Sequence, residues 1–249
     1  MSDSMVNSLE YWDVNVKGTI NLIEVMKKNN CNTIVFSSSA SVYGNSNTNL
    51  IKEKSKVQPI NPYGKTKAKV ESFLTDTFTE SSDIWKIAIL RYFNPIGAHP
   101  SGTIGEDPRG FNNNLFPRIC EIAFHKNGKL QIYGDDWPTK DGTPIRDYLH
   151  VMDVAEGHLK MLEKLINEPP QISTLNLGRG FGISTLELIK VFQEINNVFI
   201  PFEYSSLPRA SGNLFAHHFM TSSDFEKNLC PPISILLPLY STVLDMPPI

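Results

Sequence analysis

Apolar residues recur along the chain with two spacings, one typical of helices and one typical of buried strands. Between residues 15 and 28, apolar side chains lie among polar ones at helical spacing, whereas residues 33–36 (TIVF) and 87–90 (IAIL) are short apolar runs of strand length. A helix that begins near residue 61 separates these two runs. The resulting order of strand, helix and strand predicts a parallel sheet with right-handed crossovers.

The alternation continues towards the C-terminus, and no internal repeat or low-complexity tract interrupts it. The pattern predicts a helix at 115–124, a strand at 130–133, a helix at 151–166, a strand at 174–177 and a helix at 184–195. The predicted fold class is therefore α/β.

Composition narrows the class of protein. The 249 residues are 41% hydrophobic and 20% charged, which is enough for one large domain or two small ones. A net charge of -3 without a long basic run argues against nucleic-acid binding, and no apolar run approaches the ~20 residues that span a bilayer. Three widely spaced cysteines, Cys31, Cys120 and Cys230, favour a reducing cytoplasm. The adjacent His217 and His218 are more typical of a surface than of a metal site, so no metal is expected.

A tyrosine and a lysine lie four residues apart at a strong helix start. Asn61 is a good N-cap and Pro62 a good first helical residue, so Tyr63 and Lys67 should share one helical face. A free phenol has a pKa near ~10, and we expect the lysine and a positively charged cofactor ring to favour its phenolate form. The alternative is an ordinary surface pair.

A run of serines changes the balance between these two interpretations. Ser37, Ser38 and Ser39 follow the apolar run 33–36 and should lie at the carboxyl end of its strand, where open α/β sheets carry their sites. A serine hydroxyl there could complete an acid/base triad with Tyr63 and Lys67. The alternative is that the serines only satisfy the strand end.

Together, the serine cluster and the Tyr63-x-x-x-Lys67 spacing resemble the extended short-chain dehydrogenase/reductase superfamily. Four later segments are similar to its UDP-glucose 4-epimerase branch: residues 91–102 (RYFNPIGAHPSG), 105–108 (GEDP), 113–115 (NNL) and 141–153 (DGTPIRDYLHVMD). The resemblance runs from about Leu9 to about Leu229. It implies an NAD-dependent isomerase that interconverts UDP-glucose and UDP-galactose through a 4-keto sugar.

The same resemblance assigns roles to residues. Tyr63 would remove the 4-hydroxyl proton, Ser39 would bind the sugar oxygen and the phenol, and Lys67 would bind the nicotinamide ribose. Ala40, where related dehydratases carry an acidic residue, favours epimerisation over elimination. The implied NAD contacts are Asn15, Ser37, Tyr63, Lys67, Tyr92 and Phe93. The implied UDP-hexose contacts are Ser39, Asn94, Asn114, Leu115, Gln131, Ile132, Tyr133, Arg146 and Arg209.

Several of these residues also have structural interpretations. Leu115 and Ile132 have the character of core positions, and Tyr133 that of a half-buried aromatic. Arg146 could instead form an ion pair with Asp147 or another neighbour. Close to Arg209 the chain departs from the branch: Ala210, Asn213 and His217 stand where an arginine, an aspartate and a tyrosine are expected.

The expected domain organisation is incomplete. We expect the second half of an NAD-binding, Rossmann-type parallel sheet at 1–95, a smaller α/β substrate-binding region with returning Rossmann elements at 96–228, and an atypical tail at 229–249. The glycines of residues 177–184 (LGRGFGIS) fit a turn better than a dinucleotide fingerprint. We therefore expect a fragment that is inactive alone, from a family that often forms homodimers. The alternatives are a non-catalytic remnant or another NAD-dependent sugar-nucleotide epimerase.

Overall fold

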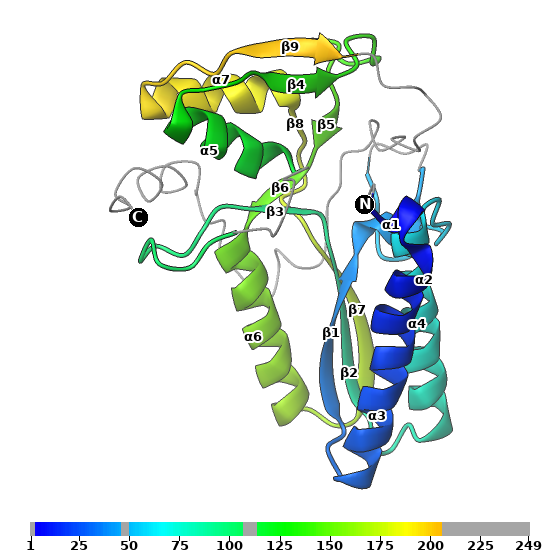
Figure 1. Cartoon of the computed structure of the whole chain (residues 1–249). Coiled ribbons are helices and arrows are strands. Elements are labelled where there is room, and N and C mark those ends of the chain that lie inside the picture. The colour runs from blue at the N-terminus through cyan, green and yellow to red at the C-terminus, as the bar shows by residue number, and fades with distance from the viewer. Residues whose placement is uncertain (1–2, 46–49, 107–113, 206–249) are drawn as a thin grey trace.

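A computed structural model of the chain describes residues 3–45, 50–106 and 114–205. Its central sheet contains β1 (Thr33–Ser39), β2 (Lys86–Tyr92) and β7 (Gln171–Leu177), in the order β1-β2-β7 and parallel throughout. Helices α3 (Gly18–Lys28) and α4 (Pro62–Glu80) cover one face, and α6 (Val151–Asn167) covers the other (Figure 1). The predicted parallel α/β arrangement is confirmed.

The carboxyl ends of the three strands meet at one edge of this sheet. In the parallel register, Ser39 of β1 is paired with Tyr92 of β2, and Tyr92 with Leu177 of β7. Helix α4 begins at the same edge, because the Asn61 side chain accepts a hydrogen bond from the Gly64 amide at 2.7 Å and Pro62 occupies the first turn. The expected N-cap is therefore confirmed.

The N-terminal helix differs from the expectation at its start. Short helices α1 (Asp3–Val6) and α2 (Ser8–Tyr11) lead into a π-helical turn, η1 (Trp12–Lys17), and only then does α3 begin. Sequence periodicity does not resolve such a wide turn, because it changes the helical phase by only one residue. Strand β1 is followed by a 3-10 turn, η2 (Ala40–Tyr43), whose residues are buried.

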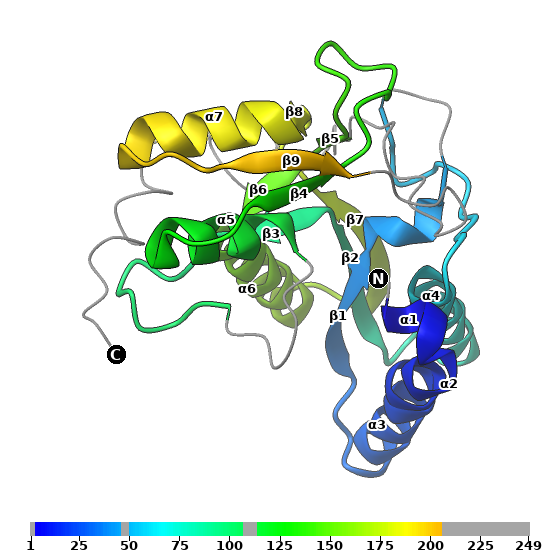
Figure 2. The ribbon, with the colours of Figure 1, turned by 45° about the horizontal axis from the view of Figure 1, so that its top comes forward.

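A second layer lies beyond the carboxyl edge of the sheet. It contains α5 (Leu115–His125), β4 (Leu130–Tyr133), α7 (Thr185–Asn196) and β9 (Phe202–Ser205), with β4 and β9 paired in parallel (Figure 2). Two short strand pairs connect the layers. They are β3 (Asn94–Ile96) with β6 (Tyr148–His150), and β5 (Ile145–Arg146) with β8 (Ile183–Ser184).

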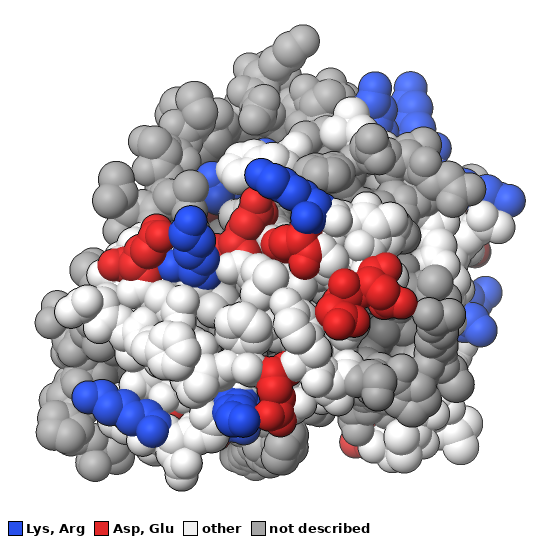
Figure 3. All heavy atoms as spheres, turned by 90° about the horizontal axis from the view of Figure 1, so that it is seen from above, with Lys and Arg blue, Asp and Glu red and all other residues white. Residues whose placement is uncertain are grey.

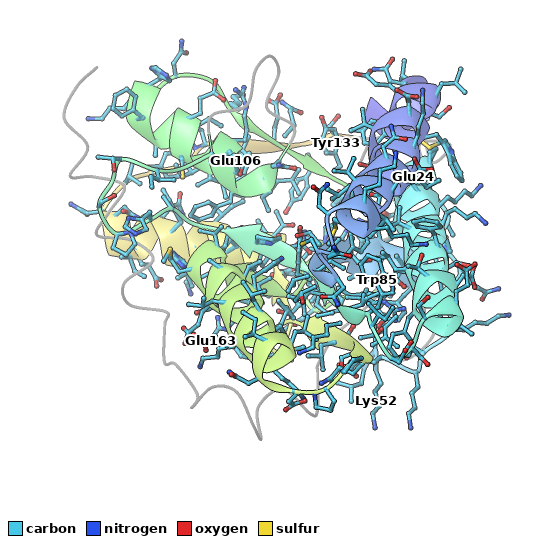
Figure 4. The ribbon with its side chains drawn as sticks, turned by 90° about the horizontal axis from the view of Figure 1, so that it is seen from below. Glu24, Lys52, Trp85, Glu106, Tyr133 and Glu163 are labelled. Atoms are coloured by element: carbon cyan, nitrogen blue, oxygen red, sulfur yellow. The ribbon has the colours of Figure 1, made fainter. Side chains whose placement is uncertain are left out.

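The described core divides into three hydrophobic clusters. One lies between the sheet and α3 and α4, where Trp85 is 3% exposed and packs with Ile23 and Leu74 (Figure 4). A second lies between the sheet and α6, around Leu90 and Met161. The third joins α5, β4 and α7. Among the described helices, none has both the length and the apolar character to cross a bilayer.

Candidate active site

Tyr63 and Lys67 lie in the first two turns of α4 and share one face of the helix. The Lys67 ammonium lies 5.7 Å from the Tyr63 ring centroid and 5.0 Å from that of Phe36, and it donates to the Ser37 carbonyl at 2.9 Å. The Tyr63 hydroxyl is hydrogen-bonded to the Ser39 hydroxyl. The structure therefore brings together the serine, tyrosine and lysine that the sequence indicated; their catalytic roles stay predictions.

Burial dominates the electrostatics of Tyr63. Burial raises the pKa of Tyr63 to about 12; neighbouring Tyr92 and Tyr11 add to the rise and only the Ser39 hydrogen bond opposes it. Burial also lowers the pKa of Lys67, because a charged ammonium is less stable away from water. The expectation that Lys67 and a positively charged cofactor ring together favour the phenolate stays a prediction; among the described residues, desolvation of the phenolate is the largest effect.

The three serines of the cluster have three different partners. The Ser37 hydroxyl lies 2.9 Å from Nε2 of His158 on α6. The Ser38 hydroxyl donates to Glu71 on α4 at 2.5 Å. Only Ser39 contacts the tyrosine; its hydroxyl also donates to that of Ser41 at 3.0 Å. Ser37 and Ser38 therefore attach the end of β1 to the helices on the two faces of the sheet, and Ser39 contacts the proposed catalytic tyrosine.

His158 has a defined hydrogen-bonding pattern. Its Nδ1 lies 2.8 Å from the Val154 carbonyl, and a carbonyl can only accept, so Nδ1 carries a proton. A neutral His158 therefore accepts the Ser37 proton at Nε2. The ring also lies against Tyr92, 6.1 Å between centroids. Sequence analysis missed His158, since 121 residues separate it from Ser37.

A buried polar network below the serines was also missed. Arg91 on β2 binds both carboxylate oxygens of Glu71, at 2.9 and 2.5 Å, and donates to the Tyr43 hydroxyl at 2.9 Å. Tyr43 in turn donates to Asn176 on β7 at 2.6 Å. The sequence did contain one indication of this network: Arg91 is a charged residue inside the buried apolar run of β2. An arginine buried there requires an anionic partner.

Two predicted cofactor contacts lie beside this group. The Asn15 amide donates to the Thr66 hydroxyl at 3.0 Å and so attaches η1 to α4, next to Lys67. Tyr92 lies at the carboxyl end of β2, paired with Ser39. Neither placement tests a contact with a dinucleotide, and both assignments stay predictions.

Phe93 and Asn94 meet the glycine turn that follows β7. The Phe93 amide donates to the Leu177 carbonyl and the Asn94 amide to the Asp147 carbonyl, both at 3.1 Å. A Cβ added to Gly178 would lie 2.6 Å from both the Phe93 ring and the Asp147 carboxylate. Only glycine fits this position without displacing one of them.

The glycine turn binds a carboxylate of the protein itself. The amides of Arg179 and Gly180 donate to the two Asp147 oxygens, each at 2.9 Å. These amides therefore serve a structural anion, and the sequence interpretation of residues 177–184 as a turn is confirmed. Burial raises the pKa of Asp147 to about 7, against the opposing effect of the two amides and of the Arg179 charge.

The remaining described residues of the predicted substrate site belong to the second layer. Asn114 is exposed and donates to Glu106 at 2.9 Å, and Leu115 packs against the core of that layer. On β4, Gln131 and Tyr133 are exposed, whereas the Ile132 side chain is 2% exposed inside the same core. The core character expected of Leu115 and Ile132 is confirmed, so a ligand on this strand would meet the side chains of Gln131 and Tyr133.

Arg146 lies on β5 and donates a hydrogen bond to the backbone of the same strand. Its guanidinium donates to the Ile145 carbonyl at 3.1 Å, and burial lowers its pKa to about 10, still high enough to keep the charge at neutral pH. The Asp147 carboxylate is bonded to the glycine turn. Arg209 lies outside the described residues.

The face above β4 and β9 carries charges of both signs (Figure 3). Glu203 on β9 accepts bonds from Gln131 at 2.5 Å and Lys129 at 3.1 Å, and Lys190 lies 3.8 Å from Glu194 on α7. The carboxylate of Glu203 therefore already has partners on β4 and on the residue that precedes it.

The sequence model of a family described as the NAD dependent epimerase/dehydratase family matches residues 1–178. A UDP-glucose 4-epimerase of Bacillus subtilis is 46% identical over 205 residues, which are 82% of this chain and 60% of that protein. A bifunctional UDP-glucose 4-epimerase and UDP-xylose 4-epimerase of Pisum sativum is 48% identical over 195 residues, 78% of this chain and 55% of the relative.

Solved structures give the same picture. A UDP-glucose-4-epimerase from Stenotrophomonas maltophila with bound NAD and formylated UDP-arabinopyranose has a TM-score of 0.85 at 41% identity, covering 91% of this chain and 66% of the other. One from Bifidobacterium longum in complex with NAD+ and UDP has a TM-score of 0.84 at 40% identity, covering 92% and 67%. The chain thus spans about 60% of the length of the Bacillus subtilis relative.

Proposed function

Because the chain belongs to the NAD dependent epimerase/dehydratase family, we propose that it carries the catalytic residues of a UDP-glucose 4-epimerase. The reaction is inversion at carbon 4 of a UDP-linked hexose, which interconverts UDP-glucose and UDP-galactose. Relatives and structural neighbours that carry this name support the assignment. The observation that carries it is the contact between the Tyr63 and Ser39 hydroxyls, with the Lys67 ammonium over the tyrosine ring.

The residues around Lys67 suit the nicotinamide ribose of NAD. The ammonium is half-buried and donates to one carbonyl, that of Ser37, and no carboxylate of the described chain forms an ion pair with it. A lysine has three N–H donors, so donors remain for the hydroxyls of a ribose. In this proposal Lys67, Tyr63, Ser37 and Asn15 hold the nicotinamide end, and Tyr92 and Phe93 border it.

In the proposed mechanism, Tyr63 acts on the proton of the 4-hydroxyl. NAD, when bound, would supply the acceptor and donor of the hydride at carbon 4, and the keto sugar would turn over between the two transfers so that its other face is reduced. The Tyr63 oxygen takes the 4-hydroxyl proton and later restores it, and the Ser39 hydroxyl turns from Ser41 to donate a hydrogen bond to the oxygen that carries charge. Lys67 supplies positive charge beside the phenol, which must lose its proton against the cost of burial.

Substrate binding is assigned to both layers. We place the hexose between Ser39 and Asn94, the diphosphate near Asn114 and Arg146, and the uracil against β4. The charged guanidinium of Arg146 suits a diphosphate, since its planar fork pairs two oxygens. Leu115, Gln131, Ile132, Tyr133 and Arg209 complete the proposed set.

Epimerisation fits the surroundings of Ser39 better than dehydration does. The recorded partners of its hydroxyl are the hydroxyls of Ser41 and Tyr63 together with the Ser41 amide. Ala40 follows it in the chain, where elimination chemistry would need a carboxyl group. We therefore favour an epimerase over a dehydratase of the same family.

Three broader assignments belong to the same proposal. The Rossmann-type part is placed at 1–95, and the substrate part with returning sheet elements at 96–228. We include a homodimer because apolar side chains are exposed along α2, η1 and α3, namely those of Leu9, Val14, Leu22 and Val25. Light scattering tests this by measuring the mass of the assembly. A cytoplasmic location is included because the chain has an odd number of cysteines.

The test measures UDP-galactose formation from UDP-glucose in the presence of NAD. The 249-residue chain is assayed beside a chimera in which its residues 9–205 replace the matching segment of the Bacillus subtilis relative. The chimera should turn over, and Tyr63→Phe should lower kcat about 10²–10⁴-fold. Tyr204→Phe, which removes an exposed phenol on β9, is the matched control and should retain activity. Undiminished turnover in Tyr63→Phe would reject the proposed base.

A further inference from the structure

One row of ionisable side chains runs along helix α4. Tyr63, Lys67 and Glu71 follow one another at intervals of four residues, so phenol, ammonium and carboxylate leave the same face. At this spacing the Cβ atoms of Lys67 and Glu71 are ~5–6 Å apart, close enough for an ion pair within the helix.

Lys67 and Glu71 nevertheless bond to different partners. The Lys67 ammonium donates to the Ser37 carbonyl at 2.9 Å. Both Glu71 oxygens are occupied from the other side: Arg91 Nε lies 2.9 Å from Oε1 and Arg91 Nη2 lies 2.5 Å from Oε2. Ser38 adds a third hydrogen bond to Oε1 at 2.5 Å. The carboxylate is therefore directed towards β2 and away from the lysine.

We propose that Arg91 is a positioning residue: by binding both carboxylate oxygens of Glu71, it prevents a Glu71–Lys67 ion pair and keeps the Lys67 ammonium beside Tyr63. The idea deepens the proposed function and rests on it, because that function requires the ammonium next to the phenol. Arg91 acts through Glu71 and touches neither sugar nor cofactor in this proposal.

The guanidinium is itself held in place. Its Nη1 donates to the Tyr43 hydroxyl at 2.9 Å and to the Glu53 backbone carbonyl at 3.1 Å, so the guanidinium has two further partners besides the carboxylate. Arg91 and Glu71 are 7% and 6% exposed. A pair this deeply buried is weak evidence for stability, since apolar residues often replace such pairs at no loss. A role in directing charge accounts for its presence.

The surroundings of Lys67 agree with this separation of charges. Burial lowers the pKa of Lys67, and no carboxylate among the described residues acts to raise it. The ionisable groups near Lys67 are Tyr63 and the Glu71–Arg91 pair, with His158 of α6 reached through the Ser37 hydroxyl. Of these, Glu71 is the one anion that could capture the ammonium within the described structure.

The test follows the pKa of Lys67 directly in the 249-residue chain. Protein labelled with ¹³C at lysine Cε is titrated by NMR, and the Lys67 signal is assigned by its loss in Lys67→Arg. Arg91→Gln should raise this pKa by about one unit or more, because the freed Glu71 carboxylate then pairs with the ammonium. Glu71→Gln should lower it, since the Arg91 charge loses its counterion.

The double variant Arg91→Gln/Glu71→Gln removes both charges and should return the pKa close to that of the unmodified chain. Arg91→Lys, which keeps the charge but lacks the two-pronged geometry, should give an intermediate value. Arg118→Gln is the control: it removes an arginine that lies 2.7 Å from Glu121 on α5 and should leave Lys67 unchanged.

Opposite shifts in the two single variants support the proposal, and a Lys67 pKa that stays constant or moves the same way in both overturns it. Should Arg91→Gln not fold, Glu71→Gln decides alone through the direction of its shift. The pKa titration and the activity assay of the chimera give independent answers. Opposite shifts with an inactive chimera would reject the epimerase assignment but keep the positioning role, whereas an active chimera without shifts would do the reverse.

Discussion

Replacing Gly178 by alanine tests the junction that holds Phe93 and Asp147 together. The new Cβ would lie 2.6 Å from the Asp147 carboxylate and from Phe93 Cδ2, and 3.1 Å from Phe93 Cε2. Ordinary contacts between such atoms are ~3.5–4.0 Å, so the overlap approaches 1 Å against two groups at once. The backbone of Gly178 is not in the left-handed region, so the effect is purely steric.

Neither neighbour can move freely. The Phe93 ring is 8% exposed, and Asp147 is 1% exposed with both oxygens bonded to amides. Overpacking at such a site costs ~1–3 kcal/mol, offset by the ~0.4–1 kcal/mol that alanine gains by restricting the unfolded chain. We expect a net loss of about 1–2 kcal/mol in the free energy of unfolding.

Urea unfolding should show this loss as a midpoint lower by roughly 0.5 M urea. This value assumes that the unfolding free energy depends on urea concentration with a slope at the upper end of the usual range. The matched control is Gly18→Ala. Gly18 opens α3 and has only the Asp13 carbonyl within 4 Å, at 3.9 Å, so alanine should raise stability by about 0.5–1 kcal/mol.

A second variant identifies the contact responsible. Phe93→Leu removes part of the ring that meets the new Cβ, so Phe93→Leu/Gly178→Ala should be less destabilised than the sum of the two single changes. If Gly178→Ala unfolds at the same urea concentration as the unmodified chain, the ring and the carboxylate do not lie where the structure places them.

Three further predictions concern ionisation and capping. Difference titration of the chain against Tyr63→Phe should show no ionisation of Tyr63 below about pH 10, since burial raises its pKa to about 12; an inflection near pH 7 would contradict this. Burial raises the folded-state pKa of Asp147 from 3.8 to about 7, so the stability this group contributes is full below pH 3.8 and is lost as the pH rises through 7. Asp147→Asn should flatten that part of the urea-midpoint profile, and an unchanged slope would refute the assignment. Ser184→Ala removes the acceptor of the Glu187 amide at 3.0 Å and should cost about 1 kcal/mol in thermal unfolding; no loss would mean that the cap is not formed.

Local chemistry made most of the regular elements predictable. The helix at Pro62 follows from its cap and first residue, and β1 and β2 follow from apolar runs bounded by polar residues. Strand β9 (Phe202–Ser205) was not predicted, because it is four residues long and exists through pairing with β4, some 70 residues earlier in the chain. The two- and three-residue strands β5 and β6 likewise depend on distant partners, which periodicity does not report.

The candidate site likewise divides into residues that local sequence predicts and partners that are distant in the chain. Tyr63, Lys67 and Ser39 could be placed together from a helix start and a strand end alone. The partners that fix them could not: His158 and Arg91 reach Ser37 and Glu71 across the sheet, and the Asp147 carboxylate reaches a turn more than 30 residues away. Glu71 lies four residues after Lys67, the spacing of a helical ion pair, yet its carboxylate binds Arg91 of β2 instead.

The high pKa of Tyr63 constrains how the proposed base can work. Lowering it from about 12 to neutrality requires roughly 7 kcal/mol of added stabilisation for the phenolate. One further positive charge at ~4 Å, in surroundings of effective dielectric ~20, contributes about 4 kcal/mol, which is more than half of the requirement. The value of about 12 already includes the Ser39 hydrogen bond, so the remainder must come from a closer approach of the Lys67 ammonium, which lies 5.7 Å from the ring centroid. A phenol that stays protonated until such a charge arrives would not remove protons unproductively. It follows that diverting Lys67 to Glu71 should impair proton removal even where the fold and the phenol are intact.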